Sequence, residues 1–129
     1  MTQSSSRPLS PHLQIWKWTL TMALSIFHRA SGCALAVGTV VLVWWLVAAA
    51  GGAGAYDSFL TCIKSTTGQV MLFGWSLALY FHLCSGIRHL LMDTGRLLTI
   101  KGSDRAGIII FLATILLTLG TWATLKGWI

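Results

Sequence analysis

Three long apolar stretches, separated by short polar connectors, dominate the chain. They cover residues 25–50, 68–91 and 106–125, so each is roughly 20 residues long or more. At about 1.5 Å per residue, a helix of that length crosses the hydrocarbon core of a bilayer. The pattern therefore predicts an all-α integral membrane protein, a single domain (1–129) with three transmembrane helices.

Glycines and polar residues define the connectors between these stretches. A run of glycine and alanine opens the segment 51–67, which we interpret as a polar loop. In the second connector, 93–105, Ser103 or Asp104 can cap the third helix. The N-terminal segment 1–24 combines two prolines with a cluster of tryptophan and lysine, which favours an extended, interfacial entry into the membrane.

The composition supports a membrane protein and argues against one other class. Hydrophobic residues make up 55% of the chain and charged residues only 9%, whereas a soluble domain carries about 25% charged residues. A net charge of +6 is a feature of many proteins that bind nucleic acid. The basic residues are scattered, however, without the clustering of a nucleic-acid interface. We therefore expect membrane lipid, and no nucleic acid, around the chain.

Most basic residues, although far apart in the sequence, are expected on the same side of the predicted membrane. Those near the N-terminus and the second connector are Arg7, Lys17, Arg29, Arg88, Arg96, Lys101 and Arg105, whereas Lys64 and Lys126 lie on the other side. The positive-inside rule then places the N-terminus in the cytoplasm, or in the matrix of a mitochondrion. Because no transit peptide is evident, we expect the inner membrane of a bacterium rather than that of a mitochondrion.

One face of the second predicted helix carries several polar or small residues. They are His82, Ser85, Gly86, His89 and Asp93. An ionisable group inside a membrane is expensive and by default suggests a functional site. His82 lies eleven residues before Asp93, hence roughly 16 Å deeper and near the midplane.

The residues alone leave two interpretations of His82 open. A neutral imidazole at that depth can hydrogen-bond to a neighbouring helix as a packing residue, or it can bind a metal. Metal binding is supported by Gly86, one turn after His82, because a glycine leaves room for a flat ring on that face. Cationic side chains also lie toward the cytoplasmic end, where haem propionates need counter-charges: His28, Arg29, Arg88 and His89. Together they fit a b-type haem lying along the helix.

The second axial ligand of such a haem is expected from another chain. His12 lies outside the predicted spans, and His28 and His89 are expected near the membrane boundary, so none shares the depth of His82. The arrangement therefore predicts a hetero-oligomer, or a homodimer related by symmetry.

Ser25 and Arg29 are four residues apart and share one helical face at the membrane boundary. A hydroxyl and a guanidinium there can bind an oxygen of a ring that enters from lipid, which suits a quinone headgroup. The alternative is an arginine that extends to a lipid phosphate without any further role.

Two motifs carry a resemblance to a known family. The first is RPLSPHL at 7–13 followed by SIFHRASG at 25–32, and the second is HLCSGIRHLLMD at 82–93. They resemble the patterns RPxSPHL…SIxHRx[ST]G and HxxxGIRHxxxD of the cytochrome b membrane-anchor subunit of succinate dehydrogenase, respiratory complex II. The resemblance covers nearly the whole chain, although the loops and the third span carry no signature.

The resemblance implies partners and site residues. The chain would form a helix bundle with a second small membrane-anchor subunit, which supplies the other haem ligand, and would hold a flavoprotein and an iron–sulfur subunit at the membrane. His82 matches the axial ligand of haem b. Ser25 and Arg29 match the ubiquinone site, while His28, Arg29 and His89 match the region of the haem propionates. The resemblance assigns no clear role to Asp93.

The function implied is that of a membrane anchor in succinate:ubiquinone oxidoreductase, which passes electrons from the tricarboxylic acid cycle to the respiratory chain. This chain alone carries no complete active site. One alternative is the anchor of a quinol:fumarate reductase, which uses the same parts in reverse. Another is a haem-free structural anchor or small transporter, in which His82 would only pack helices together.

Overall fold

The computed structural model describes residues 10–125, so residues 7–9 of the first motif, and Lys126, lie outside the described residues. The described part is all helical. Its elements are a one-turn 3₁₀ helix, His12–Gln14, followed by α1 (Leu20–Ala50), α2 (Ala53–Lys64), α3 (Thr66–Asp93) and α4 (Ile100–Leu125). Helices α1, α3 and α4 are long and apolar enough to cross a membrane. The predicted all-α membrane fold with three spans is thereby confirmed.

Hydroxyl side chains determine where the long helices begin. Thr19 accepts a hydrogen bond from the Met22 amide and starts α1 at Leu20, before the predicted span at residue 25. Ser65 starts α3 in the same way. For α4 the hydroxyl of Thr99 accepts from the Gly102 amide at 3.2 Å. The predicted cap at Ser103 or Asp104 is therefore wrong, since α4 begins at Ile100.

The expectation of a polar loop over 51–67 is also wrong, because most of that segment is α2. Gly52 has a φ of +88°, a conformation outside the helical region, which interrupts the helix between α1 and α2. Tyr56, Phe59 and Ile63 then recur at helical spacing, and Phe59 is buried. Its ring packs edge-on against Trp44 of α1, with ring centroids 4.8 Å apart. A short amphipathic helix thus closes one end of the bundle.

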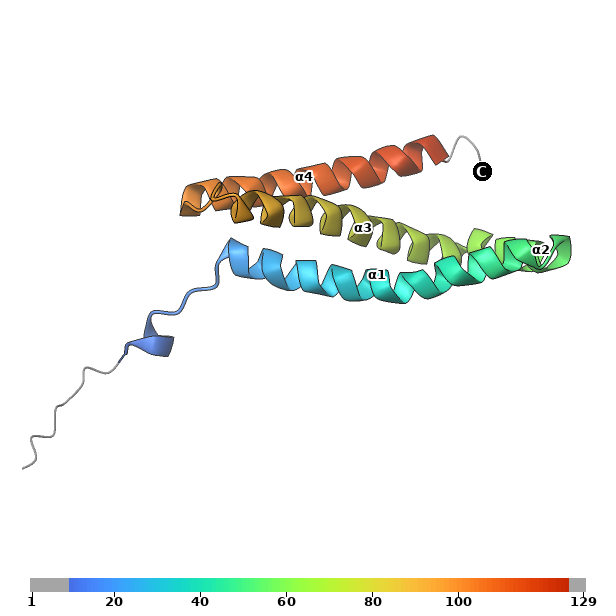
Figure 1. Cartoon of the computed structure of the whole chain (residues 1–129), viewed down its shortest axis with the longest axis horizontal. Coiled ribbons are helices and arrows are strands. Elements are labelled where there is room, and N and C mark those ends of the chain that lie inside the picture. The colour runs from blue at the N-terminus through green and yellow to red at the C-terminus, as the bar shows by residue number, and fades with distance from the viewer. Residues whose placement is uncertain (1–9, 126–129) are drawn as a thin grey trace, which may run out of the picture.

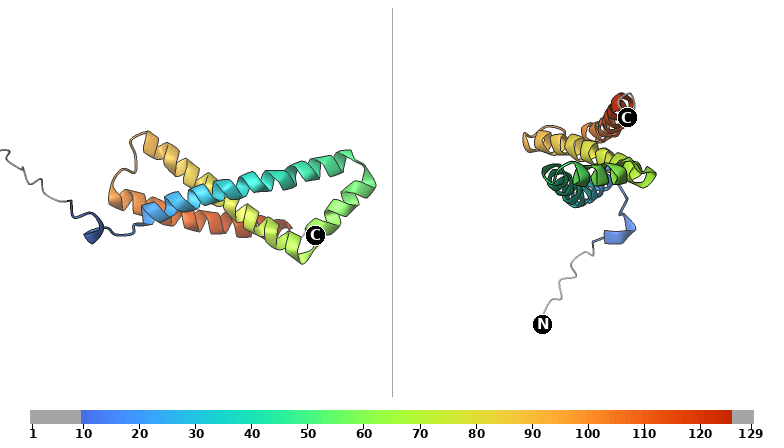
Figure 2. Two further views of the ribbon diagram at one scale, coloured as in Figure 1. Left: turned by 90° about the horizontal axis from the view of Figure 1, so that it is seen from below. Right: turned by 90° about the vertical axis from the view of Figure 1, so that its right-hand side faces the viewer.

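Helix α3 lies between α1 and α4 (Figure 1). The beginning of α1, the end of α3 and the beginning of α4 lie at one end of the bundle, and α2 lies at the other (Figure 2). The small buried core near the first end is formed by Leu24, Phe81 and Ile110, one from each long helix. Most other large apolar side chains point outward, as helices in contact with lipid or other membrane helices require.

Polar side chains hold α3 and α4 together along their length. The Arg88 guanidinium donates to the Ser103 hydroxyl, and the Trp122 indole donates to the Ser76 hydroxyl at 2.9 Å. Tyr80 and Thr121 share a hydrogen bond of 2.6 Å. Such bonds are useful between membrane helices, because lipid tails provide little hydrophobic driving force for one helix to pack on another.

Candidate functional site

Three histidines gather between α1 and α3, toward the end where α1 begins. The rings of His28 and His82 are stacked, with centroids 4.1 Å apart and planes only 10° from parallel. The ring of His89 lies two turns after His82 on α3, and its centroid is 4.9 Å from that of His28. We call this group the histidine cluster (His28, His82, His89).

The stack places His28 and His82 at the same height in the bundle. We expected His28 near the membrane boundary and only His82 at depth, yet the two rings are in contact. Helix α1 begins at Leu20, so that His28 lies about 12 Å from the start of this helix at 1.5 Å per residue.

The two stacked rings are not placed to bind one metal ion between them. The lone pair of an imidazole nitrogen lies in the plane of its ring, so two nearly parallel rings face each other without pointing at a common position. Within residues 10–125, no group of three or more histidine, cysteine or acidic side chains could hold a metal ion. A metal at His82 therefore needs further ligands from outside this cluster.

The Nδ1 atom of His82 is held by α1. It lies 3.2 Å from the backbone carbonyl oxygen of His28 and 3.1 Å from the hydroxyl oxygen of Ser31. A carbonyl oxygen can only accept a hydrogen bond, so Nδ1 carries a proton, and in the neutral imidazole the free lone pair then belongs to Nε2. A histidine that donates Nδ1–H to a backbone carbonyl and offers Nε2 is in the form that metal ligands usually take.

Two glycines lie beside these rings, and only Gly32 is needed for a close approach. A Cβ atom on Gly32 of α1 would lie 3.2 Å from Cε1 of His82, which is tighter than ordinary contact. A Cβ atom on Gly86 of α3 would lie 3.9 Å from Nε2 of His28, at ordinary contact distance. We expected Gly86 to leave room for a flat ring, and the ring that packs near it in this structure is the imidazole of His28.

Ser25 and Arg29 lie on α1, each within one turn of His28. Ser25 is half-buried and Arg29 is exposed, so both can contact a molecule that approaches from outside the bundle. Asp93 is the last residue of α3 and is also exposed. The predicted site residues of α1 and α3 therefore lie near one end of the bundle, as their order along the two helices requires.

Arg88 does not belong to this group, although we expected it among the cations for haem propionates. Its side chain is only 4% exposed and donates to Ser103 of α4. Six residues at about 100° each place Arg88 roughly a third of a turn away from His82 around α3. Its role in the structure is to connect α3 with α4.

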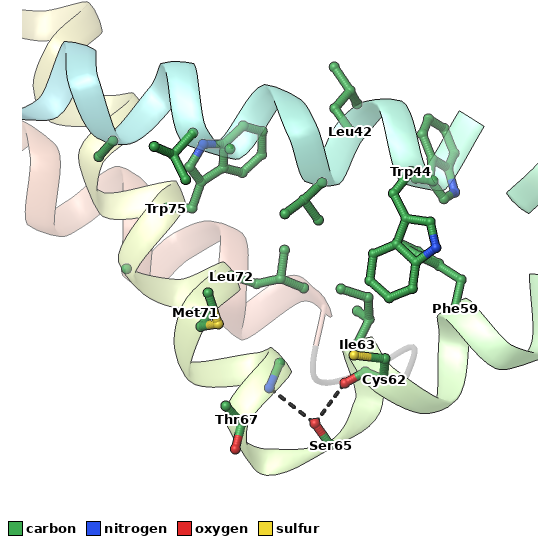
Figure 3. Close-up of a pocket in the computed structure, with 17 residues that line it drawn as sticks. Leu42, Trp44, Phe59, Cys62, Ile63, Ser65, Thr67, Met71, Leu72 and Trp75 are labelled. Carbon is green, nitrogen blue, oxygen red and sulfur yellow. Dashed lines mark hydrogen bonds between the residues drawn. The ribbon is translucent and has the colours of Figure 1, made fainter. Parts of the chain in front are cut away.

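The largest cavity that we describe lies elsewhere. It has a volume of about 750 Å³ and lies between α1, α2 and α3, toward the end closed by α2 (Figure 3). Its walls are almost entirely apolar and include Trp44, Phe59, Met71 and Trp75. None of the predicted site residues lines it.

Comparison with known proteins assigns the family. The sequence model of the succinate dehydrogenase/fumarate reductase transmembrane subunit matches residues 3–121. The chain belongs to this family. It is 37% identical over 116 residues to the succinate dehydrogenase cytochrome b556 subunit of Paracoccus denitrificans, covering 90% of this chain and 89% of the relative. The predicted family is thereby confirmed.

Other members of the family are equally similar. The cytochrome b556 subunit of Rickettsia felis succinate dehydrogenase is 37% identical over 119 residues, which is 92% of each chain. The mitochondrial cytochrome b560 subunit of succinate dehydrogenase from Sus scrofa is 37% identical over 121 residues, covering 90% of this chain and 70% of the relative. Bacterial and mitochondrial members thus share most of the length of this chain.

Proposed function

We propose that this chain is the membrane anchor of a succinate:ubiquinone oxidoreductase, in which it binds haem b through His82 and contributes to the quinone site. Membership of the family and the three apolar helices support the role of a membrane subunit. The relatives are named succinate dehydrogenases, which favours succinate oxidation over the fumarate reductase alternative.

The geometry of His82 carries the haem proposal. Its Nδ1 atom faces the His28 carbonyl and the Ser31 hydroxyl, which leaves Nε2 to bind iron. The relatives are cytochromes b, which supports iron in a haem rather than a bare metal ion. One histidine from this chain requires the other axial ligand from a second small anchor subunit. When bound, the haem accepts and returns single electrons.

The remaining polar side chains near His82 suit the haem propionates. Nε2 of His28 is buried and has no hydrogen-bond partner among the described residues. A buried polar atom of that kind usually has a partner in the complete assembly. We assign His28, together with Arg29 and His89, to the region of the propionates, where an N–H group or a positive charge stabilises a carboxylate.

Ser25 and Arg29 would bind the quinone headgroup. The Arg29 guanidinium carries five N–H donors, and the Ser25 hydroxyl can donate to a quinone oxygen. Negative charge develops on the ring oxygens as quinone is reduced, and a fixed positive charge stabilises it. The exposure of Arg29 supports this role, because the ring must enter from outside the chain.

The chemistry that precedes quinone reduction belongs to the partners in this proposal. Succinate would be oxidised at a flavoprotein subunit, and an iron–sulfur subunit would carry the electrons to the quinone. Both would dock on the cytoplasmic side of a bacterial inner membrane, next to the N-terminus, where most basic residues lie.

Replacement of His82 tests the haem assignment. In the detergent-extracted complex, purified through a tag on this chain, His82→Ala should lose the b-type signal of the reduced-minus-oxidised spectrum. The control is Leu83→Ala, at the next residue of α3, where the side chain is 52% exposed. An assembled His82→Ala complex with the full haem content would contradict the assignment.

Replacement of Arg29 tests the quinone site. Arg29→Ala should lower quinone reduction roughly 10- to 100-fold, the value of one charge-assisted hydrogen bond of about 1.5–3 kcal/mol. Succinate oxidation by a soluble dye should stay unchanged. Arg105→Ala is the matched control, since Arg105 is exposed on α4 at the same end of the bundle. Equal loss of both activities would point to failed assembly and contradict the quinone role.

A further inference from the structure

The Nδ1 atom of His82 has two partners on α1, and only one of them belongs to the backbone. The second is the hydroxyl oxygen of Ser31, at 3.1 Å, which is slightly closer than the His28 carbonyl oxygen at 3.2 Å. Ser31 is only 7% exposed. Its hydroxyl is therefore a polar group inside the helix interface, directly beside the proposed haem ligand.

The direction of these hydrogen bonds follows from the protons available. Ser31 donates its single hydroxyl proton to the carbonyl oxygen of His28, at 2.8 Å. Toward His82 the hydroxyl can then only accept, as the carbonyl does. Both partners of Nδ1 are acceptors, so the contact is favourable only while Nδ1 is protonated. The three atoms thus form a closed arrangement that selects one tautomer of His82.

The arrangement also restricts the orientation of the imidazole. One acceptor would allow the ring to swing about a single N–H bond, whereas two acceptors on the same helix limit that motion. Gly32, the residue after Ser31, lets the ring lie against α1, since a Cβ there would be 3.2 Å from Cε1. Ser31 and Gly32 together hold the Nδ1–Cε1 edge of the ring against α1.

We infer that Ser31 is a positioning residue for the haem ligand: its hydroxyl fixes the tautomer and orientation of His82 and lowers the reduction potential of the haem. The inference rests on the proposed function of His82. A hydrogen bond accepted from Nδ1–H raises the basicity of the ligand at Nε2. A more basic ligand stabilises Fe(III) relative to Fe(II), so loss of the hydroxyl favours reduction.

The test is a potentiometric titration of the haem in the intact purified complex. Ser31→Ala should shift the Fe(III)/Fe(II) equilibrium toward Fe(II) by up to about tenfold, the value of one neutral hydrogen bond, which is about 59 mV for one electron. Ser31→Thr retains the hydroxyl and should stay near the wild-type potential.

Thr118→Ala is the control. Thr118 is 1% exposed on α4, and its hydroxyl donates to the Thr114 carbonyl oxygen of its own helix at 2.8 Å. Loss of that buried hydroxyl should leave the potential unchanged. A shift of equal size in Thr118→Ala would attribute the effect to packing and overturn the role of Ser31.

The remaining outcomes separate this inference from the proposed function. An unchanged potential in Ser31→Ala, in a complex with full haem content, would overturn the role of Ser31 and leave His82 as ligand. Loss of haem from Ser31→Ala supports positioning if Ser31→Thr retains haem, whereas loss from both variants contradicts it. Full haem in an assembled His82→Ala complex would overturn the proposed ligand itself, and with it this inference.

Discussion

At the end of the bundle where α1 begins, small residues let α3 approach closely enough for two imidazole rings to stack. Toward the other end, large aromatic rings line an open space between the helices. We call the first the histidine end (His28, His82, His89) and the second the indole end (Trp44, Trp45, Trp75). At the indole end α1 and α3 diverge and α2 connects them (Figure 2), with a cavity of about 750 Å³ among the three helices.

Glycines serve different purposes at the two ends. At the indole end, a Cβ on Gly38 would overlap the indole nitrogen of Trp75, and a Cβ on Gly68 would lie 2.6 Å from the carbonyl oxygen of Ile63. At the histidine end, a Cβ on Gly32 would touch only the ring of His82. Glycines therefore let helices pack closely at the indole end, whereas Gly32 makes room for the ring of His82 at the histidine end.

Gly68→Ala should have the largest effect on stability. The added Cβ meets backbone carbonyl oxygens of Cys62 and Ile63, which cannot move without displacing α2 from α3. We expect a cost of about 3 kcal/mol or more, the upper range for overpacking, and hence little assembled complex. The measurement is the yield of intact complex from membranes, with Gly74→Ala as control, because a Cβ there meets nothing within 4 Å. Equal yields of the two variants would contradict the prediction.

Gly38→Ala should cost less, because the obstacle is a side chain. The indole of Trp75 must shift, and the adjoining cavity, which Trp75 also lines, offers it room. We expect about 1–3 kcal/mol, seen as a lower Tm of the purified complex. Adding Trp75→Leu should remove most of the cost of Gly38→Ala. If the two changes were simply additive, the contact between these residues would not be the cause.

The fold was largely predictable from sequence because its signals are local. The length of each apolar run predicts a span, and capping hydroxyls such as Thr19 and Ser65 adjust where helices begin. Helix α2 was missed because the glycines before it and the charged Asp57 and Lys64 within it were interpreted as signs of a polar loop. Its signal was the spacing of Tyr56, Phe59 and Ile63.

The sequence predicted which candidate site residues share a face of one helix, but not which residues of different helices contact each other. Periodicity placed His82, Gly86 and His89 on one face of α3, but it contains nothing about how α1 crosses α3. The stack of His28 on His82 and the contact of Ser31 with Nδ1 both arise from that crossing. Arg88 was misplaced because its charge was considered without its position around the helix.

Ser103→Ala probes the polar connection beside the histidine end. The change leaves the buried guanidinium of Arg88 without its hydroxyl partner on α4, and its Nε already has none among the described residues. We expect a loss of about 1–2 kcal/mol in stability, toward the lower range for hydrogen bonds to charged groups. The check is the Tm of the complex, with Ser58→Ala on the exposed surface of α2 as control. A Tm equal to that of the control would show that the bond contributes nothing.

Gly32→Ala should have the smallest effect on stability, but it should alter the haem potential or spectrum. The Cβ would lie 3.2 Å from Cε1 of His82, so the ring must yield by a few tenths of an ångström. The better helix propensity of alanine, up to about 1 kcal/mol, offsets that cost, and Tm should stay nearly constant.

The displaced ring should nevertheless shift the haem potential or spectrum. Gly74→Ala, whose Cβ would meet nothing within 4 Å, should change neither. Gly38→Ala should show the reverse pattern, a lower Tm with an unchanged haem potential. If Gly32→Ala lowered Tm as much as Gly38→Ala without altering the haem, glycines at the two ends would serve the same structural purpose, and the comparison would fail.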